Sequence, residues 1–354
     1  MEHTSFDLLN PEIILAAVES YLPVRLDGTI EPFPSYVNRV YGVRSLDDRE
    51  MVVKFYRPGR WRYETILDEH TFLFDLAAAE IPVVAPIRDD EGDSLFEIEV
   101  DGAPEVEDGW NRGGSREIGD GPRVDTLGVP PEAPVFTFAI FPKRGGRGFD
   151  AEGDEEWFRL GALVGRIHQV GRRRPAPNRV VVDPRRWTGA YARELVAGGV
   201  VHPDLVAEFE DLIAEVTEQI APLFADVSAL RIHGDCHRGN ILERPGEGLV
   251  MIDFDDMMTG PAVQDLWLLL PDHAGECTRE LTHLIDGYSQ FQELDRRELE
   301  LIEPLRFMRM IHFLAWRARQ RHDHWFQREF PEWGNHAFWV RELEDLKEQA
   351  RYIV

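Results

Sequence analysis

Apolar residues follow two different spacings along the chain, and together they predict a mixture of strands and helices. Short apolar runs at 51–56, 135–140, 229–232 and 249–252 fit β-strands. Apolar residues recur at helical spacing in 63–79, 157–170 and 301–325, and we expect a helix over each range. A first helix is expected after Asn10 and Pro11, a capping residue followed by a proline suited to the first turn. A strongly apolar helix is expected to begin at Asp265.

Residues 89–134 interrupt this regular pattern. The segment is rich in Gly, Pro and acidic residues. Such a composition cannot bury enough apolar surface to offset the entropy lost on ordering, so it predicts a long loop or a partly disordered insertion. A neutral loop fits this composition better than a regulatory flap.

The polar residues with the most informative spacing lie between positions 233 and 253. Asp235 follows a strand-like run in the sequence His-Gly-Asp, Asn240 comes five residues later, and the run 249–252 leads directly into Asp253. Kinases use an Asp to orient the acceptor hydroxyl, and an Asn and a second Asp to hold metal ions on the phosphates. Mg²⁺ prefers hard oxygen ligands and keeps several waters. The spacing therefore predicts a phosphotransferase with Asp235 and Asp253 as catalytic carboxylates, and with Asn240 and Asp253 as Mg²⁺ ligands.

A lysine on an upstream strand should accompany these residues if the fold is that of a kinase. Lys54 lies in the apolar run 51–56 and would act as a point charge on the phosphates of ATP. A carboxylate on the following helix should hold this lysine. Glu69 fits the kinase spacing best, and Glu64 is the alternative. Taken alone, Lys54 fits an exposed strand lysine better, and the phosphate role is favoured only together with the residues between 233 and 253.

The hairpin before Lys54 lacks the glycine-rich loop of conventional protein kinases. Residues 35–41 contain no glycine. A phosphate-covering loop can instead use backbone N–H groups and small polar side chains. Ser35 and Asn38 are the candidates here, although an ordinary hairpin turn would look the same.

Neighbouring residues are expected to support the site. We expect Asp265 either to hold the backbone of the catalytic loop or simply to cap its own helix. His233 should brace the loop, and His237 should be only a turn residue. His168, among apolar neighbours on the helix 157–170, is expected to be a hydrogen-bonded core histidine.

A second group of residues has weaker chemical expectations. Asp255 could assist a metal ion through a water molecule. Cys236 is expected to be a small buried loop residue rather than a redox switch, because thiol reactivity needs thiolate character and exposure. Arg306, Arg309 and Arg317 are expected to be solvated or ion-paired rather than to face the acceptor.

The flanking sequences resemble one family. The segments that show this resemblance are Ser-Tyr-Val-Asn-Arg-Val-Tyr (35–41), Val-Val-Lys-Phe-Tyr-Arg-Pro (52–58), Arg-Ile-His-Gly-Asp-Cys-His-Arg-Gly-Asn (231–240), Gly-Pro-Ala-Val-Gln-Asp-Leu-Trp (260–267) and Ile-Glu-Pro-Leu-Arg (302–306). They are similar to the bacterial stress response kinase A family, cytoplasmic serine/threonine kinases with an aminoglycoside phosphotransferase-like fold. The similarity runs through nearly the whole chain.

This resemblance implies an α+β, bilobal, protein-kinase-like fold. A small β-rich lobe would span residues 1–141, with the insertion at about 89–134, and a larger, mainly helical lobe would span 142–354. It also implies ATP- and Mg²⁺-dependent phosphorylation of protein Ser or Thr, with autophosphorylation, in a stress response. Ser35 would contact ATP, Lys54 the phosphates, Asp235 the acceptor proton, and Asn240 and Asp253 Mg²⁺.

Composition narrows the possible partners. The 354 residues carry 65 acidic against 39 basic side chains, a formal charge of −26. This charge disfavours nucleic acid and anionic membranes, which bind basic surfaces. Two cysteines offer no disulfide framework, and no apolar run approaches the ~18 residues of a membrane span. We expect a cytoplasmic monomer without a secretory signal.

Two other functions remain compatible with these motifs. The Gly of His-Gly-Asp and the missing glycine-rich loop also allow a small-molecule kinase acting on a choline-, homoserine- or aminoglycoside-like alcohol. A non-catalytic nucleotide sensor is the third possibility, but the complete set Lys54, Asp235, Asn240 and Asp253 argues against it.

Overall fold

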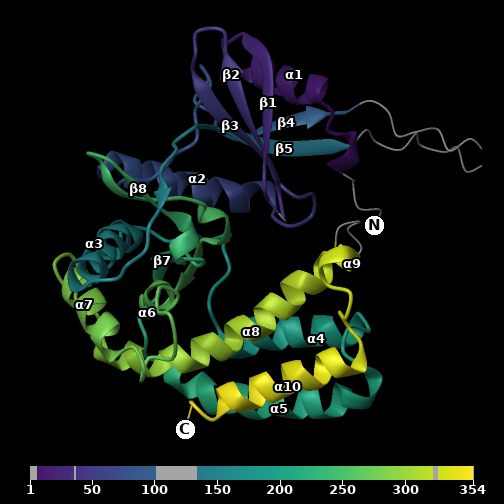
Figure 1. Cartoon of the computed structure of the whole chain (residues 1–354), viewed down its shortest axis with the longest axis vertical. Helices are drawn as coiled ribbons and strands as arrows, with labels where there is room; N and C mark the ends of the chain where they lie inside the picture. The colour runs from purple at the N-terminus through teal and green to yellow at the C-terminus, as the bar shows by residue number, and fades with distance from the viewer. Residues whose placement is uncertain (1–5, 36, 101–133, 322–325, 354) are drawn as a thin grey trace, which may run out of the picture. The chain divides into compact units, whose positions relative to one another are not determined.

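The structure is a computed structural model of the whole chain, and it describes residues 6–35, 37–100, 134–321 and 326–353. Contacts divide the chain into two compact units (Figure 1). The smaller unit contains residues 1–63 and 86–143, and the larger unit contains residues 64–85 and 144–354. The sequence placed the boundary between residues 141 and 142, whereas in the structure the segment 64–85 groups with the larger unit.

The smaller unit is built on an antiparallel sheet in the order β1-β2-β3-β5-β4. Its strands are β1 Leu26–Phe33, β2 Arg39–Ser45, β3 Glu50–Phe55, β4 Phe96–Glu99 and β5 Val135–Pro142. The short 3₁₀ helix η1 Phe6–Leu8 and helix α1 Pro11–Tyr21 precede the sheet. The side chain of Asn10 accepts a hydrogen bond from the backbone N–H of Ile13 at 2.9 Å, so the predicted helix cap is confirmed.

One face of this sheet forms the core of the smaller unit together with α1. Ile14, Ala17 and Val18 of the helix are buried in the same cluster as Phe55 and Phe138. The rings of Phe55 and Phe138 lie 5.2 Å apart. Because β3 is central, pairing with β2 on one side and β5 on the other, its backbone and the position of Lys54 are held on both sides.

The prediction of a loop throughout 89–134 was wrong for its first part. Strand β4 lies within this segment and pairs with β5, with Phe96 opposite Phe138. Phe96 is buried against the Phe138 ring at 5.6 Å, so a short aromatic and β-branched stretch finds a place in the core despite its acidic neighbours. Residues 101–133 of the predicted insertion lie outside the described residues.

The larger unit is mainly helical and contains two small sheets (Figure 1). Its α-helices are α2 Tyr63–Ala78, which begins one residue inside the smaller unit, α3 Asp154–Gly171, α4 Gly189–Ala197, α5 Val206–Ile220, α6 Val263–Trp267, α7 Thr278–Tyr288, α8 Ile302–Arg319, α9 Phe326–Glu329 and α10 His336–Ala350. Its strands are β6 Arg147–Gly148, β7 Leu230–Ile232, β8 Ile241–Arg244, β9 Gly248–Met251 and β10 Met258–Gly260, with β10 paired to β7 and with β6, β8 and β9 in one sheet. Short segments of 3₁₀ or π-helix lie between them: η2 Pro184–Thr188, η3 Pro203–Leu205, η4 Ala221–Phe224, η5 Arg238–Asn240, η6 Phe254–Asp256 and η7 Arg296–Leu301.

Helix α2 belongs to the larger unit because its buried side chains pack there. Phe72 lies edge-on to Phe254 at 5.7 Å between ring centroids, and the guanidinium of Arg231 lies over the Phe72 ring. Asp68 accepts a hydrogen bond from the backbone N–H of Asn178 at 2.8 Å. The helix is therefore attached directly to the strands and loops that carry the predicted catalytic residues.

Helices α3 and α7 cross at unusually short range because glycines line both of them. A Cβ on Gly161 would lie 1.9 Å from the carbonyl oxygen of Leu284, and a Cβ on Gly287 would lie 1.9 Å from that of Phe158. Contact distances of this kind leave no room for a side chain. This crossing positions His168 of α3 and Tyr288 of α7 for the contacts described below.

Two helix predictions need correction at their ends. The helix expected over 301–325 ends at Arg319 in the structure, and residues 322–325 lie outside the described residues. The helix expected to begin at Asp265 begins two residues earlier, at Val263, and ends at Trp267. The leucines that follow are buried or partly buried in a turn, since apolar runs alone do not distinguish a short helix from a buried turn.

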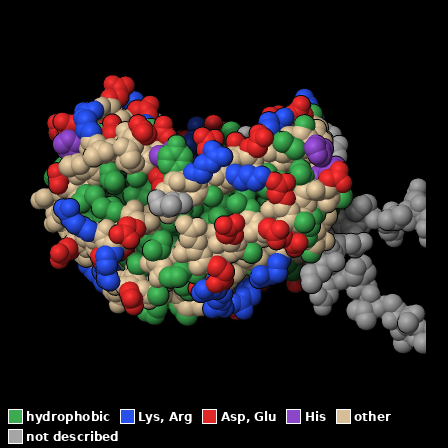
Figure 2. All heavy atoms as spheres, turned by 90° about the horizontal axis from the view of Figure 1, so that it is seen from below, with side chains coloured by type: hydrophobic (Ala, Val, Ile, Leu, Met, Phe, Trp, Pro, Cys, Tyr) green, Lys and Arg blue, Asp and Glu red, His purple; other side chains and the backbone are tan. Residues whose placement is uncertain are grey.

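The face of the larger unit that is seen in Figure 2 carries acidic and basic side chains interspersed with one another. Ion pairs connect neighbouring helices there, including Arg319 of α8 with Glu194 of α4 at 2.7 Å and Lys347 of α10 with Glu208 of α5. Exposed pairs of this kind contribute little stability each. Among the described residues, no helix has both the length and the apolar character that a membrane crossing requires.

The crossing of α3 and α7 predicts a strong effect of a single added methyl group. We expect Gly161→Ala to destabilise the protein by about 1–3 kcal/mol, the usual cost of overpacking, because the new Cβ meets backbone that cannot move alone. Chemical denaturation would measure this change. Gly275→Ala is the matched control, since a Cβ there meets nothing within 4 Å. Equal stability of the two variants would contradict the proposed close crossing.

Candidate active site

The candidate active site is formed where strand β7 ends and a tight loop begins. The loop follows Ile232 and includes Asp235, and its geometry requires glycine at position 234. Gly234 has φ +84°, and a Cβ there would lie 2.1 Å from the carbonyl oxygen of Asp256. The Gly in His-Gly-Asp therefore lets the segment that follows Asp253 pass directly against the loop.

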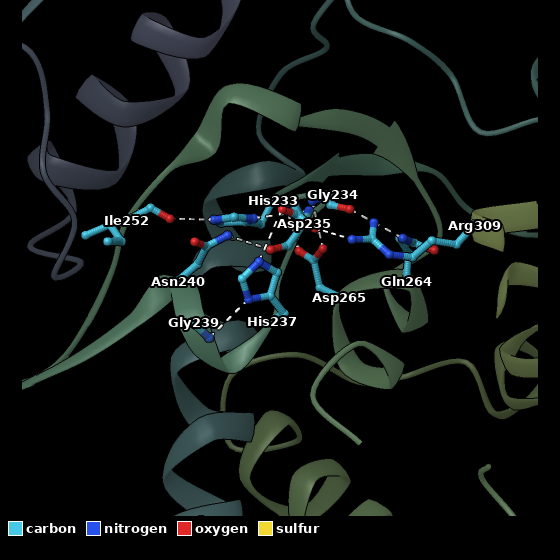
Figure 3. Close-up of polar contacts among 10 residues, drawn as sticks. All are labelled: His233, Gly234, Asp235, His237, Gly239, Asn240, Ile252, Gln264, Asp265 and Arg309. Atoms are coloured by element: carbon cyan, nitrogen blue, oxygen red, sulfur yellow. Dashed lines mark hydrogen bonds and ion pairs between the residues drawn. The ribbon is translucent and has the colours of Figure 1, made fainter. Parts of the chain in front are cut away.

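The carboxylate of Asp265 holds the backbone of this loop (Figure 3). Its Oδ2 accepts a hydrogen bond from the backbone N–H of His233 at 2.7 Å, and its Oδ1 accepts one from Gly234 at 2.9 Å. Of the two roles expected for Asp265, the structure confirms that of loop anchor. Charge-assisted hydrogen bonds to buried N–H groups are among the strongest available to a carboxylate.

A buried histidine and tyrosine support Asp265 from behind. His168 Nε2 lies 2.9 Å from Asp265 Oδ2, and His168 Nδ1 lies 3.1 Å from the hydroxyl of Tyr288. The expectation of a hydrogen-bonded core histidine is confirmed. Burial raises the pKa of Tyr288 well above its ordinary value, so its hydroxyl stays protonated and can donate to His168. This orientation leaves the Nε2 proton of His168 for Asp265.

His233 braces the loop from the other side, as expected. Its Nε2 lies 2.9 Å from the carbonyl oxygen of Ile252, and its Nδ1 accepts a hydrogen bond from the backbone N–H of Asp235 at 3.2 Å. The imidazole also packs against Phe254, with 4.4 Å between ring centroids. One side chain thus connects the loop of Asp235 to the segment of Asp253.

Asp235 projects from this loop with both carboxylate oxygens in contact with basic groups (Figure 3). Its Oδ1 accepts a hydrogen bond from Arg309 Nη2 at 2.5 Å, and its Oδ2 lies 3.4 Å from His237 Nε2. Burial opposes ionisation, but the contact with His237 and the charge of Arg309 outweigh it and hold the pKa of Asp235 well below its usual range. The carboxylate is therefore an ionised hydrogen-bond acceptor at any physiological pH.

The role of His237 is larger than the sequence suggested. Its Nδ1 accepts a hydrogen bond from the backbone N–H of Gly239 at 3.0 Å, which is the turn role expected of it. Its other nitrogen faces Asp235, so the prediction of a turn residue alone was wrong. Two residues of separation in a turn are enough to bring both side chains together, but spacing alone does not reveal where they point.

Asn240 is buried and fixed next to Asp235. Its Nδ2 donates to the backbone carbonyl of Asp235 at 2.9 Å, and its own backbone carbonyl accepts from the N–H of Ile252 at 3.0 Å. The amide oxygen Oδ1 is then directed away from the loop, since the nitrogen is occupied. The short hairpin of β8 and β9 returns the chain to Asp253, as the sequence predicted.

Asp253 adopts a left-handed backbone conformation, with φ 61° and ψ 65°. Non-glycine residues rarely adopt this conformation, and Asp and Asn tolerate it best. Its side chain is exposed. An amide oxygen from Asn240 and a carboxylate from Asp253 form a hard-oxygen donor set that suits Mg²⁺. The residues present therefore fit a divalent ion, while their assignment as ligands remains a prediction.

Glu69 has a buried partner within its own unit. Its carboxylate accepts a hydrogen bond from Arg179 Nη2 at 3.0 Å, and Nη1 of the same arginine donates to the backbone carbonyl of Asp255 at 2.7 Å. Glu69 therefore connects α2 to the segment that follows Asp253. Glu64, the alternative, is exposed. The role of Glu69 as the carboxylate that holds Lys54 remains a prediction.

Lys54 and Ser35 lie in the smaller unit. Lys54 is buried on central strand β3, and its Nζ lies 5.2 Å from the ring of Tyr56. Ser35 is partly buried in the connection between β1 and β2. In the same connection, buried Asn38 accepts a hydrogen bond from the N–H of Arg57 at 3.1 Å, so its side chain stabilises the turn. The roles of Ser35 and Lys54 toward ATP remain predictions.

Cys236 is fully buried beside Asp235. Burial raises the pKa of its thiol well above the ordinary value, and the negative charges of Asp265 and Asp235 act in the same direction. The thiol therefore stays protonated and unreactive. This agrees with the predicted role as a small loop residue.

Sequence reasoning did not identify the contacts that two arginines make at the site. Arg309 is ion-paired, as expected of it, but the pattern of α8 did not identify Asp235 as its partner. Arg179, which connects Glu69 to Asp255, was not singled out at all. Their partners are distant in the sequence. Arg309 and Asp235 are 74 residues apart, and Arg179 is 76 residues from Asp255 and 110 from Glu69.

Comparison with known families agrees with this geometry. The family model described as "Phosphotransferase enzyme family" matches residues 29–302. Stress response kinase A of Escherichia coli (strain K12) is 36% identical over 356 positions, which cover 99% of this chain and 95% of that protein. Serine/threonine protein kinase RdoA of Salmonella typhimurium (strain LT2) is 34% identical with the same coverage.

Solved structures with much lower identity share the fold. The amicoumacin kinase hAmiN, solved in complex with AMP-PNP, Ca²⁺ and Ami, has a TM-score of 0.70 at 16% identity, and the match covers 97% of this chain and 95% of that one. The choline kinase LicA from Streptococcus pneumoniae has a TM-score of 0.59 at 14% identity, with 96% and 98% covered. The predicted aminoglycoside phosphotransferase-like fold, with an antiparallel sheet in one unit and helices in the other, is confirmed. The chain belongs to the phosphotransferase enzyme family and, within it, to the stress response kinase A proteins.

Proposed function

We propose that this protein transfers the γ-phosphoryl group of ATP to Ser or Thr hydroxyl groups of proteins, including its own, in a bacterial stress response in the cytoplasm. The observation that carries the proposal is an ionised Asp235 on a loop held by Asp265, with Asn240 bonded to the backbone of Asp235 and His233 bonded to the residue before Asp253. The names of the relatives, stress response kinase A and serine/threonine protein kinase RdoA, support a protein acceptor.

Each residue would act mainly by position and charge. Asp235 would accept a hydrogen bond from the acceptor hydroxyl and orient it in line with the phosphoryl group. Lys54 would contact the phosphates, and Ser35 the nucleotide. Transition states of phosphoryl transfer are usually analysed as loose, so orientation matters more than complete proton removal.

Asn240 and Asp253 would hold Mg²⁺, and their oxygen donors support this ion over softer metals. When bound, Mg²⁺ would neutralise charge on the phosphate oxygens. The left-handed backbone of Asp253 supports a functional constraint at this position, since strained conformations cluster at functional sites. The amicoumacin kinase was solved in complex with a nucleotide analogue and Ca²⁺, which supports nucleotide and divalent-ion use by the fold.

A small-molecule alcohol kinase is the second candidate. It is favoured by the named activities of the solved structures, which include an amicoumacin kinase and a choline kinase. A radiolabelled γ-phosphate assay with a generic protein and with a pool of alcohols would separate the two. Label on protein supports the first proposal, and label only on an alcohol supports the second.

Replacement of the acceptor-facing carboxylate should remove turnover and spare binding. We expect Asp235→Asn to lower kcat by ~10² or more, the contribution typical of general acid–base catalysis. Nucleotide affinity, measured by calorimetry, should stay within a few-fold of wild type. Asp286→Asn, the same change at an exposed position of α7, is the control. Wild-type turnover in folded Asp235→Asn would remove Asp235 from catalysis.

The metal assignment predicts loss of Mg²⁺-dependent nucleotide binding. We expect Asp253→Ala to abolish the difference between nucleotide affinities measured with Mg²⁺ and with a chelator. Asp253→Asn should reduce this difference by ~10-fold or more while keeping the left-handed backbone, because Asn tolerates that conformation but offers a neutral amide oxygen in place of the carboxylate. Asp272→Ala, at an exposed position, controls for loss of negative charge. Intact Mg²⁺ dependence in Asp253→Asn would refute the assignment.

A further inference from the structure

The side chain of Arg309 is placed against the carboxylate of Asp235 by the packing of α8. The buried face of this helix includes Leu305, Met308 and Ile311, which fixes its rotation about its own axis. One turn before Arg309, Arg306 lies over the Trp267 ring at 4.8 Å and donates to the carbonyl oxygen of Asp272 at 2.7 Å. The position of Arg309 is therefore set by the helix rather than by Asp235.

Arg309 differs from Arg231, a buried structural arginine of the larger unit, in how few acceptors it meets. Arg231, almost fully buried, donates to Asp75 and to the carbonyl oxygens of Val170 and Gly171. Arg309 is 28% exposed at its side chain, and among the described residues it bonds only the Oδ1 of Asp235. A guanidinium carries several N–H donors in a planar fork suited to carboxylates and phosphates. Within the described residues the remaining N–H groups of this fork form no hydrogen bond, and the guanidinium lies against the carboxylate of Asp235 (Figure 3).

The charge balance at this position decides which acceptor fits. Asp235 alone would attract a cationic acceptor. Arg309 cancels that charge, and the imidazole of His237, 44% exposed, faces the other carboxylate oxygen. An ammonium group next to the reacting hydroxyl would meet a guanidinium, whereas a carboxylate or phosphate there would complete its hydrogen bonds.

We propose that Arg309 is a specificity-determining residue that binds an anionic group next to the accepting hydroxyl, so that the acceptor is a Ser or Thr flanked by acidic or phosphorylated residues. This inference rests on the proposed function, because it takes Asp235 as the residue that meets the acceptor. It runs against the simple expectation that an acidic protein should prefer basic substrates. Net charge acts over the whole surface, whereas Arg309 acts at contact distance from the reacting group.

The test uses the full-length enzyme and a set of peptides with one Ser, identical except for the two residues that flank it. The flanking residues are Asp, phosphothreonine, Ala or Lys, and kcat/KM is measured for each peptide. The ratio of each value to that of the Ala peptide cancels any general effect of a variant on Asp235. We expect wild type to favour Asp over Lys by ~10-fold or more, the scale of a partly desolvated charge pair. The phosphothreonine and Asp peptides separate phosphate from carboxylate as the preferred anion.

The variants assign the preference to one side chain. Arg309→Met should bring the Asp-to-Ala ratio close to one, Arg309→Lys should retain part of it, and Arg309→Glu should reverse it. Arg319→Met, on the same helix but paired with Glu194, is the control and should keep the wild-type ratio. A wild-type preference for Lys, or an Asp preference that survives in Arg309→Met, would overturn the proposal.

Failure of the proposed function gives a different result. If no peptide is phosphorylated but alcohols are, the protein-kinase proposal fails and the Arg309 proposal is tested with 3-hydroxypropionate against ethanolamine, two acceptors of similar size and opposite charge. A preference for the carboxylate that is lost in Arg309→Met supports the role of Arg309. A preference for ethanolamine overturns it.

Discussion

The arrangement of the active site depends on one buried carboxylate, Asp265, and on the hydrogen bonds that it accepts from two backbone N–H groups. The bonds from His233 and Gly234 set the direction in which the chain leaves β7, and this direction decides where Asp235 points. Such an ion is costly to bury unless its hydrogen bonds are complete. The crossing of α3 and α7 completes them, because it brings His168 and Tyr288 behind the same carboxylate. The glycines at that crossing therefore act on the active site through packing, although they lie outside it.

The same loop also determines where the segment of Asp253 can pass. Because Gly234 has no Cβ, the carbonyl oxygen of Asp256 can approach it closely, and His233 then reaches the carbonyl of Ile252. Asn240 adds bonds to both segments. Asp235, Asn240 and Asp253, which have different proposed roles, thus lie on short turns that are hydrogen-bonded to one another rather than on long flexible loops. A change at any of these contacts would move Asp235 relative to Asp253, and misplacement of reacting groups by small distances can cost large factors in rate.

The sequence predicted those features that depend on local spacing. The hairpin that leads to Asp253 and the helix that carries Glu69 follow from motifs within a few tens of residues. For Asp265 the sequence left loop anchor and helix cap as alternatives, and the hydrogen bonds from His233 and Gly234 decide for the first. Strand β4 was missed because its acidic neighbours dominate the composition of 89–134, whereas its place in the sheet depends on packing of Phe96 against Phe138. The partner of Arg309 was missed for a related reason. It lies 74 residues away, and a surface arginine on an amphipathic helix has no local signature that names its partner.

The environment of Asp235 also bears on the mechanism that such a site can support. Arg309 and His237 lower the proton affinity of its carboxylate, so it is a weak base. A mechanism that required full deprotonation of the acceptor before attack would be slowed by both contacts. A loose transition state makes a smaller demand, because the hydroxyl proton leaves late and the main requirement is a fixed line of approach. Asp235 is well suited to that task, since it is always ionised and is held from both oxygens. Arg309 and His237 therefore weaken Asp235 as a base, but they also fix the direction of its carboxylate and neutralise part of its charge. For a loose transition state, the fixed direction and reduced charge matter more than the lost basicity.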